Sequence, residues 1–572
     1  MSKFYRRSIA LVLALIMTVV MLAGCGGSGG GNSTGGGSKG LDVDPAEVAM
    51  PLAEKATIKG LTNFPANTES EPNNRTIFKR LEESTNVHVE WRAIQSDQWG
   101  DKIQLEMSNA KTLPDFVFNA GFGDTDLIKY AKNGVIIALE DYIDKYMPNL
   151  KKVFEQVPEY KAMCMDSDGH IWALPWIEQL GSGNEAIQLL GNMPFINVAW
   201  LDFLGLSMPT TTDEFEAVLI AFRDNAAALK AEFSIEGDII PMSCILNDGG
   251  QDPYILINGF GEGYGDPDSW KHMAVTDEGK VVCVAQSEGF KKGTEWLHSL
   301  YEQGLIDVEA FTQDWSTYVA KGKSNRYGVC FTWDVSNVAN PVHNASQDVT
   351  DISNWDWQPL PMLKADTYNL TPATASYTSG FQRGRCVVTS VAENPALVCA
   401  WLDQMYDPMQ SPQNNWGTYG EDDDFDIFVM GKNDKGEDML QHAPLGDASP
   451  VEVREAESVN GPLAVLDSYY GEYVTLPDDA AYRLDWIKET YTPACTARYC
   501  LPSFFMTQED SVTDSNIGAD IGKCVNEFKA RSVLEGFTDA DWDQFQADLT
   551  AYKVDEYVAL YQKYFDAYLA AQ

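Results

Sequence analysis

Basic residues are scarce in this chain of 572 residues. Lysine and arginine together number 41, against 84 aspartates and glutamates, so the formal net charge is −43 at pH 7. Nucleic-acid binding depends on basic side chains that neutralise phosphates, and docking flat on an anionic lipid surface needs basic residues as well. The charge balance therefore argues against both, and we expect no nucleic-acid partner.

Motifs of familiar catalytic and metal sites are also absent from the sequence. The six histidines are dispersed, and no HxH, HExxH, P-loop or GxSxG pattern occurs. Carboxylates are so numerous that any two could be proposed as a glycosidase pair. The acidic run at residues 421–426 could bind a hard cation, but a solvated loop is the favoured interpretation. We expect no enzyme, no cofactor and no metal site.

Paired cysteine motifs are missing too. The chain has ten cysteines but no Cys-x-x-Cys, and the nine that follow Cys25 cannot all pair because their number is odd. The closest two, Cys495 and Cys500, lie in a tyrosine-rich stretch. Scattered buried thiols are favoured over a disulfide framework, which stays an alternative.

Long apolar runs are absent after residue 24. Before it, Lys3, Arg6 and Arg7 precede an apolar run at residues 9–23, which is short for a spanning helix and typical of a signal peptide. Small residues come directly before Cys25, as cleavage and lipidation at that cysteine require. A plain secretion signal with a chance cysteine is the alternative. The Gly/Ser-rich residues 26–40 predict a flexible tether behind the anchor.

The remaining chain is long enough for a large core and for two or more domains. Periodicity predicts strands at residues 56–62, 87–91 and 116–118, with helices at 75–84 and 98–109 between them. This alternation is typical of a layered α/β domain. Further helices are predicted by the capping box of Thr211 and Glu214, by Asn394-Pro395, and by two amphipathic stretches at the C-terminal end.

Aromatic residues are plentiful, with 15 tryptophans and 25 tyrosines. Several lie beside polar residues at predicted strand ends, among them Trp176 near Glu178 and Trp333 next to Asp334. Flat aromatic rings pack on the apolar faces of sugar rings, and charged or amide side chains bind the hydroxyls. Most aromatic residues serve the core, so those that follow a strand are the better candidates for a saccharide site.

Several segments, in their order along the chain, resemble the extracellular solute-binding proteins of ABC importers, in the sugar-binding lipoprotein branch. The segments that carry the resemblance are residues 113–117 (LPDFV), 133–142 (NGVIIALEDY), 169–175 (GHIWALP), 200–215 (WLDFLGLSMPTTTDEF), 416–421 (WGTYGE) and the C-terminal helices. The match covers the mature chain from end to end.

This resemblance implies a fold and partners. The fold is α/β, of the periplasmic-binding-protein-like type II, with two lobes joined by crossing hinge segments. We expect residues 56–174 and about 375–440 in the first lobe, and residues 175–374 and about 441–572 in the second. The partners implied are a saccharide ligand and ABC permease subunits, with the membrane contacted only through the lipid on Cys25. A monomer at the extracytoplasmic face is expected.

The resemblance also implies ligand-binding positions at strand ends and near the crossings. They are Phe64, Asn119, Trp176, Glu178, Tyr254, Trp333, Asp334, Phe381 and Arg383. Many members of the branch carry an ion loop after the helix that begins near residue 212, but residues 226–228 are alanines where ligands belong, so no calcium site is expected there. A cell-surface glycan hydrolase and an adhesion or scaffold lipoprotein are the alternative functions.

Overall fold

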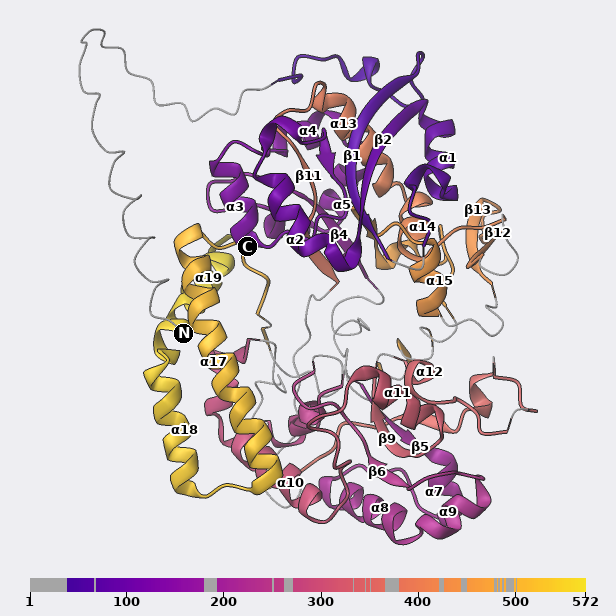
Figure 1. The fold of residues 1–572 in the computed structure, drawn as a ribbon, viewed down its shortest axis with the longest axis vertical. Coiled ribbons are helices and arrows are strands. Elements are labelled where there is room, and N and C mark those ends of the chain that lie inside the picture. The colour runs from indigo at the N-terminus through magenta and orange to yellow at the C-terminus, as the bar shows by residue number, and fades with distance from the viewer. Residues whose placement is uncertain are drawn as a thin grey trace, which may run out of the picture. The chain divides into compact units, whose positions relative to one another are not determined.

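The structure is a computed structural model that describes residues 39–572 with several gaps. The gaps are residues 66–67, 180–192, 249–250, 262–270, 333, 345, 350, 366–379, 421–425, 444–449, 478–480, 482–483, 486–487, 490–497, 500 and 572. The predicted signal peptide, Cys25, the tether up to residue 38 and Trp333 lie outside the described residues. Residues 39–572 form one compact unit, shown as a ribbon in Figure 1.

A six-stranded sheet forms the centre of the first lobe, in the order β14-β4-β11-β3-β1-β2. Its strands are β1 (Ala56–Phe64), β2 (Val87–Gln95), β3 (Phe116–Val117), β4 (Leu174–Glu178), β11 (Phe381–Val388) and β14 (Leu463–Val465). β1 runs parallel to β2 and β3, β14 runs parallel to β4, and β11 is antiparallel to both β3 and β4. Five of the six strands therefore point the same way.

Helices of the first lobe follow the apolar spacing of the sequence. In α1 (Thr76–Thr85) the predicted stripe of Ile77, Phe78 and Leu81 is buried. Asn394 caps α13 (Pro395–Leu402) by accepting a hydrogen bond from the Leu397 N–H, as Asn-Pro at that point predicts. The other helices are α2 (Ser96–Met107), α3 (Asp124–Lys132), α4 (Glu140–Tyr146), α5 (Pro148–Gln156), α6 (Pro158–Cys164), α14 (Gln410–Trp416) and α15 (Pro450–Glu457); β12 (Phe428–Lys432) and β13 (Asp438–His442) form a hairpin.

The second lobe contains a four-stranded sheet in the order β10-β5-β9-β6. Its strands are β5 (Pro194–Asn197), β6 (Ile240–Met242), β9 (Tyr327–Phe331) and β10 (Trp357–Pro359), and β7 (Met273–Val275) and β8 (Val281–Cys283) form a separate hairpin. The helices are α7 (Val198–Leu204), α8 (Thr212–Asp224), α9 (Ala226–Glu232), α10 (Glu288–Glu302), α11 (Trp315–Lys323) and α12 (Val335–Val338). The predicted capping box is present at the start of α8, where Thr211 and Glu214 exchange hydrogen bonds.

Three helices end the chain and lie side by side (Figure 1): α17 (Gln508–Glu535), α18 (Asp539–Ala551) and α19 (Val554–Ala571). Their apolar faces, with Ile521, Phe545 and Phe565, join the core of the second lobe. The two C-terminal amphipathic helices of the sequence prediction are confirmed as α18 and α19, whereas the long α17 was not predicted.

Two lobe boundaries differ from those expected. β4 continues in the first sheet to Glu178, because Trp176 and Ile177 pair with β11 and β14, so the chain leaves the first lobe after Glu178 rather than at residue 175. β14 also belongs to the first sheet, and Val453 and Val474 pack in the first-lobe core. The described residues 441–443 and 450–475 therefore pack with the first lobe, not with the second as expected.

Another crossing from the first lobe to the second lies just before α17. Phe505 packs among buried residues of the first lobe, and the next residue, Met506, packs in the core of the second. Seven cysteines lie in the described residues, all with free thiols and six of them buried, so scattered thiols are confirmed for this part of the chain. Within the described residues, no helix is both long and apolar enough to cross a membrane.

Candidate functional site

The carboxyl ends of five parallel strands meet at one edge of the first sheet. Phe64 ends β1, Asn119 follows β3, and Glu178 ends β4. Because β11 runs the opposite way, its first residue, Phe381, lies at this same edge, paired with Ile177. Ligands of open α/β sheets bind outside the carboxyl ends of the strands. The topology thus brings four of the sequence-predicted residues to one edge.

Asn119 and its neighbour on β1 form the first part of this edge. The Asn119 Nδ2 donates to Asn63 Oδ1 at 3.0 Å, and the Asn63 Nδ2 donates to the Asn119 carbonyl at 2.8 Å. Asn119 adopts a positive φ of 54°, a conformation that asparagine tolerates better than most residues. Phe64 is half-buried. These two hydrogen bonds hold the asparagines against each other. An amide side chain can form more hydrogen bonds than these, so part of their capacity stays available to a ligand.

Trp176 and Glu178 belong to a buried polar cluster with Asn415 of α14 and Arg454 of α15. The Trp176 Nε1 donates to Asn415 Oδ1 at 3.3 Å, and the Asn415 Nδ2 donates to Glu178 Oε1 at 2.7 Å. Arg454 donates to Asn415 Oδ1 at 2.5 Å and lies 3.5 Å from Glu178 Oε2. Glu178 is 6% exposed and Asn415 is fully buried. A carboxylate so deeply buried is stable here because the amide and the guanidinium both face it.

Arg385 of β11 lies against the same cluster, and the sequence analysis missed it. Its guanidinium carbon is 6.0 Å from the Trp176 ring centroid. The pairing of β11 with β4 is irregular between Gln382 and Cys386, as in a β-bulge, which turns a strand and re-aims its side chains. Burial, and then the neighbouring charge of Arg454, lower the pKa of Arg385 to about 10.

Polar atoms without partners lie around this cluster. The Nε of half-buried Arg385 and the hydroxyl of half-buried Tyr470 are both buried, and neither has a hydrogen-bond partner. The Tyr470 ring is 6.5 Å from the Trp416 ring, and burial, followed by the Glu178 charge, raises the pKa of Tyr470. A buried donor without a partner costs about 1–3 kcal/mol, so two of them in one cluster require an explanation.

His442 lies beside these aromatic rings. Its imidazole is 4.7 Å from the Phe428 ring and 5.7 Å from the Trp416 ring, and its Nδ1 is 3.1 Å from the Thr475 hydroxyl. Burial lowers the pKa of His442 to about 4, so the ring is neutral at pH 7. The aromatic rings of Phe428, Trp416 and His442 therefore lie together at this end of the cluster and carry no charge at pH 7.

Phe381 and Arg383, also predicted as site residues, have other neighbours. Phe381 stacks on Tyr160, with ring centroids 5.8 Å apart and planes at 9°. Arg383 is buried, and it donates to the Met163 carbonyl, to Asp124 Oδ1 and to the Ser503 carbonyl. Its guanidinium also covers the Phe505 ring at 4.5 Å. Arg383 thus connects elements of the protein and has little hydrogen-bonding capacity left for a ligand.

Asp334 and Tyr254, the two predicted residues of the second lobe that the structure describes, have different surroundings. Asp334 follows the carboxyl end of β9, but its carboxylate caps α12 by accepting from the Ser336 N–H at 2.7 Å. Tyr254 is 1% exposed, with its hydroxyl 3.1 Å from Thr294 Oγ1 and the Lys529 ammonium 4.1 Å from its ring centroid. Tyr254 therefore lies in the core of the second lobe, away from any strand end.

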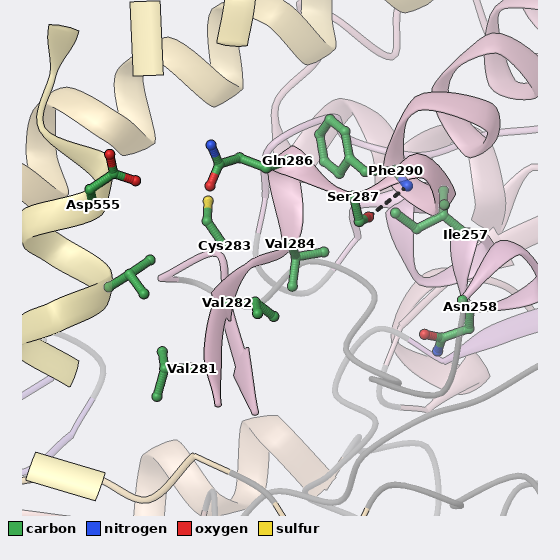
Figure 2. Close-up of a pocket in the computed structure, with 13 residues that line it drawn as sticks. Ile257, Asn258, Val281, Val282, Cys283, Val284, Gln286, Ser287, Phe290 and Asp555 are labelled. Atoms are coloured by element: carbon green, nitrogen blue, oxygen red, sulfur yellow. Dashed lines mark hydrogen bonds between the residues drawn. The ribbon is translucent and has the colours of Figure 1, made fainter. Parts of the chain in front are cut away.

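A pocket of about 330 Å³ lies elsewhere in the second lobe, between the β7–β8 hairpin, the start of α10 and α19. Figure 2 shows its lining, which is mostly apolar and includes Ile257, Val284, Phe290 and Val558. The Ser287 hydroxyl is already engaged with the Phe290 N–H at 3.0 Å. None of the sequence-predicted ligand residues lines this pocket, and its few polar groups do not converge, so it is not the candidate site.

In the described part of the chain, no group of three or more histidine, cysteine, aspartate or glutamate side chains could hold a metal ion. The residues of this cluster that the sequence analysis did not identify are Arg385, Asn415, Arg454 and Tyr470. Three of them come from segments after residue 410 that only the tertiary fold brings to the sheet edge. The nearest signal for Asn415 in the sequence is Trp416, which begins the segment 416–421 that carries the resemblance.

Comparisons with known proteins agree with this architecture. The chain is 42% identical, over 523 residues that cover 91% of it and 92% of the relative, to the fructooligosaccharide ABC transporter substrate-binding protein FusA of Streptococcus pneumoniae serotype 4. It is 22% identical, over 71% of its length and 72% of the relative, to lipoprotein LipO of Bacillus subtilis. No family model matches the chain.

A solved structure has a similar fold. The structure of S. pneumoniae FusA in complex with kestose matches with a TM-score of 0.79 at 41% identity, covering 90% of this chain and 100% of that one. The two α/β lobes are therefore those of a type II solute-binding protein, as the sequence resemblance implied. The chain belongs to the family of ABC transporter substrate-binding proteins, which bind a solute and do not transform it.

Proposed function

We propose that this protein captures a neutral oligosaccharide, of the fructooligosaccharide class, at the carboxyl edge of its first sheet and delivers it to an ABC permease. The observation that carries the proposal is the cluster of Trp176, Glu178, Asn415, Arg454 and Arg385, in which an aromatic ring lies among amide, carboxylate and guanidinium groups. Sugars need both kinds of surface, because their rings have apolar faces and hydroxyl rims.

Two further considerations support this ligand class. The relative that is 42% identical is named for fructooligosaccharides, and its solved structure contains kestose. The net charge of −43 disfavours an anionic ligand. Phe64, Asn119 and Phe381 at the sheet edge, with Trp333 and Asp334, complete the proposed contacts. Tyr254 is left out because it is buried in the core, and Arg383 because its donors are already engaged.

Binding of kestose is the direct test. We expect the chain without residues 1–25 to bind kestose with one site per molecule in isothermal titration calorimetry. Its melting temperature should rise with kestose, because a ligand at a hundred times its dissociation constant adds about 2.7 kcal/mol to the free energy of unfolding. Maltotriose and a short peptide serve as comparison ligands. A chain that responds to the peptide but to no saccharide would refute the proposed ligand class.

The proposal includes a lipid anchor at Cys25, where the sequence has a signal peptide that ends in small residues before the cysteine. The relative LipO is named a lipoprotein, which agrees with it. We expect the full chain expressed in a Gram-positive host to incorporate labelled palmitate and the Cys25→Ser variant to incorporate none. Equal labelling of the two proteins would rule out lipidation at this cysteine. A monomer is expected in light scattering of the chain without residues 1–25.

A further inference from the structure

The half-buried Arg385 differs from its neighbour on β11 in the partners of its guanidinium. Its neighbour Arg383, two residues earlier on β11, donates hydrogen bonds to three separate oxygen atoms. Arg385, in contrast, has a buried Nε without a partner and forms no ion pair within the described part of the chain. Among the described residues, the charged neighbour that affects its ionisation is a second cation, Arg454. Protein stability alone does not account for a guanidinium in this position.

Tyr470, like Arg385, has a buried polar group without a hydrogen-bond partner. Its hydroxyl is buried without a hydrogen-bond partner, although Glu178 and Arg454 are near enough to influence its ionisation. The tyrosine ring packs 6.5 Å from Trp416, next in sequence to Asn415, which in turn binds Trp176 and Glu178. Arg385 and Tyr470 therefore belong to one contiguous cluster, and both have donors to spare.

The backbone holds Arg385 in this position. The Gly384 carbonyl accepts from the Phe122 N–H at 3.0 Å, and the Arg385 carbonyl accepts from the Ala120 N–H at 2.7 Å. These bonds fix the irregular stretch of β11 against the loop that follows β3. The main chain at Arg385 is consequently fixed before any ligand arrives, which lowers the entropy cost of binding.

We propose that Arg385 and Tyr470 are specificity-determining residues of the first-lobe site, whose unpartnered donors are completed by the hydroxyl oxygens of one sugar unit packed beside Trp176. The planar fork of a guanidinium matches two adjacent oxygens, such as vicinal hydroxyls, and the tyrosine hydroxyl adds a third hydrogen bond. This inference rests on the proposed saccharide function. It goes further by naming the residues that distinguish one sugar from another.

A ligand-binding role and a structural role have opposite consequences for the ligand-free protein. If the two side chains stabilised the fold, their removal would lower the melting temperature. If they bind a ligand instead, substituting an apolar residue of similar shape removes a buried unsatisfied donor. The ligand-free protein then becomes equally stable or more stable. Stability without sugar and affinity for sugar should therefore change in opposite directions.

The experiment compares Arg385→Met and Tyr470→Phe with two matched controls in the chain without residues 1–25. The controls are Arg326→Met, in the second lobe, and Tyr473→Phe, which lies three residues after Tyr470. We expect both site variants to melt no lower than the parent without sugar. Affinity for kestose, measured by calorimetry, should fall about 10- to 100-fold for Arg385→Met and about 3- to 10-fold for Tyr470→Phe. The controls should bind kestose like the parent.

The outcomes separate this inference from the proposed function. A parent protein that binds no saccharide refutes the proposed function and the inference with it. A parent that binds kestose, with site variants that bind it equally well, overturns the inference alone. Site variants that melt at lower temperature and keep the parent affinity assign Arg385 and Tyr470 a structural role, which also overturns it.

Discussion

Gly384→Ala is expected to lower the free energy of unfolding by about 3 kcal/mol, at the upper end of the usual cost of overpacking. A Cβ at this position would overlap the carbonyl oxygen of Phe122. Neither the backbone of β11 nor that of the loop after β3 can move away easily. The Phe122 N–H donates to the Gly384 carbonyl, and the Ala120 N–H donates to the Arg385 carbonyl. Urea unfolding followed by tryptophan fluorescence measures the change.

The matched control is Gly100→Ala, since Gly100 lies within α2 and a Cβ there meets no atom within 4 Å. Alanine is preferred over glycine inside a helix by about 1 kcal/mol, so this variant should be slightly more stable than the parent. If Gly384→Ala were as stable as Gly100→Ala, the close approach of β11 to the loop after β3 would be wrong. The placement of Arg385 would then be wrong with it.

Local signals in the sequence were sufficient to predict β1, β2 and β3 of the first lobe, with α1 and α2 between them and α13 later in the chain. Apolar residues at helical spacing gave α1, and the Thr211–Glu214 capping box gave the start of α8. Such signals depend on neighbours within a few residues. They do not reveal where a strand pairs, and β4 therefore ends three residues later in the first sheet than the predicted boundary at residue 175.

The position of the described residues 450–475 could not be predicted for the same reason. β14 has only three residues, and its place in the sheet comes from pairing with β4, nearly 300 residues earlier in the chain. Asn415, Arg454 and Tyr470 reach the candidate site through this long-range packing. The sequence pointed to Trp176 and Glu178 because they are close together, and it could not point to the partners that surround them.

The two arginines of β11 show why an irregular strand is hard to predict from the sequence. Side chains two residues apart share a face of a regular strand, so Arg383 and Arg385 should be equivalent. The irregular pairing between Gln382 and Cys386 breaks that rule. Arg383 consequently contacts Met163, Asp124 and Phe505, whereas Arg385 lies against Trp176.

Replacing Arg383 with methionine is expected to lower the free energy of unfolding by about 3 kcal/mol, because breaking a buried ion pair leaves the other charge and several carbonyls without partners. Arg383 is 5% exposed in its side chain, and Asp124 is 26% exposed, which places the loss at the lower end of the range for buried pairs. Arg383→Lys keeps the charge but not the planar fork, so it should recover only part of the stability.

The loss of stability caused by Arg383→Met should be concentrated where the chain crosses between the lobes. Arg383 donates to the Ser503 carbonyl and covers the Phe505 ring, so its loss should speed amide hydrogen exchange at residues 503–508 more than in β1 or β2. Kestose affinity of the folded fraction should change little, in contrast to Arg385→Met. An Arg383→Met protein with parental stability and exchange but without affinity would show instead that Arg383 contacts the ligand, as the sequence resemblance implied. The two arginines, separated by a single glycine, would then have exchanged roles, and the irregular pairing of β11 would have to be oriented the other way.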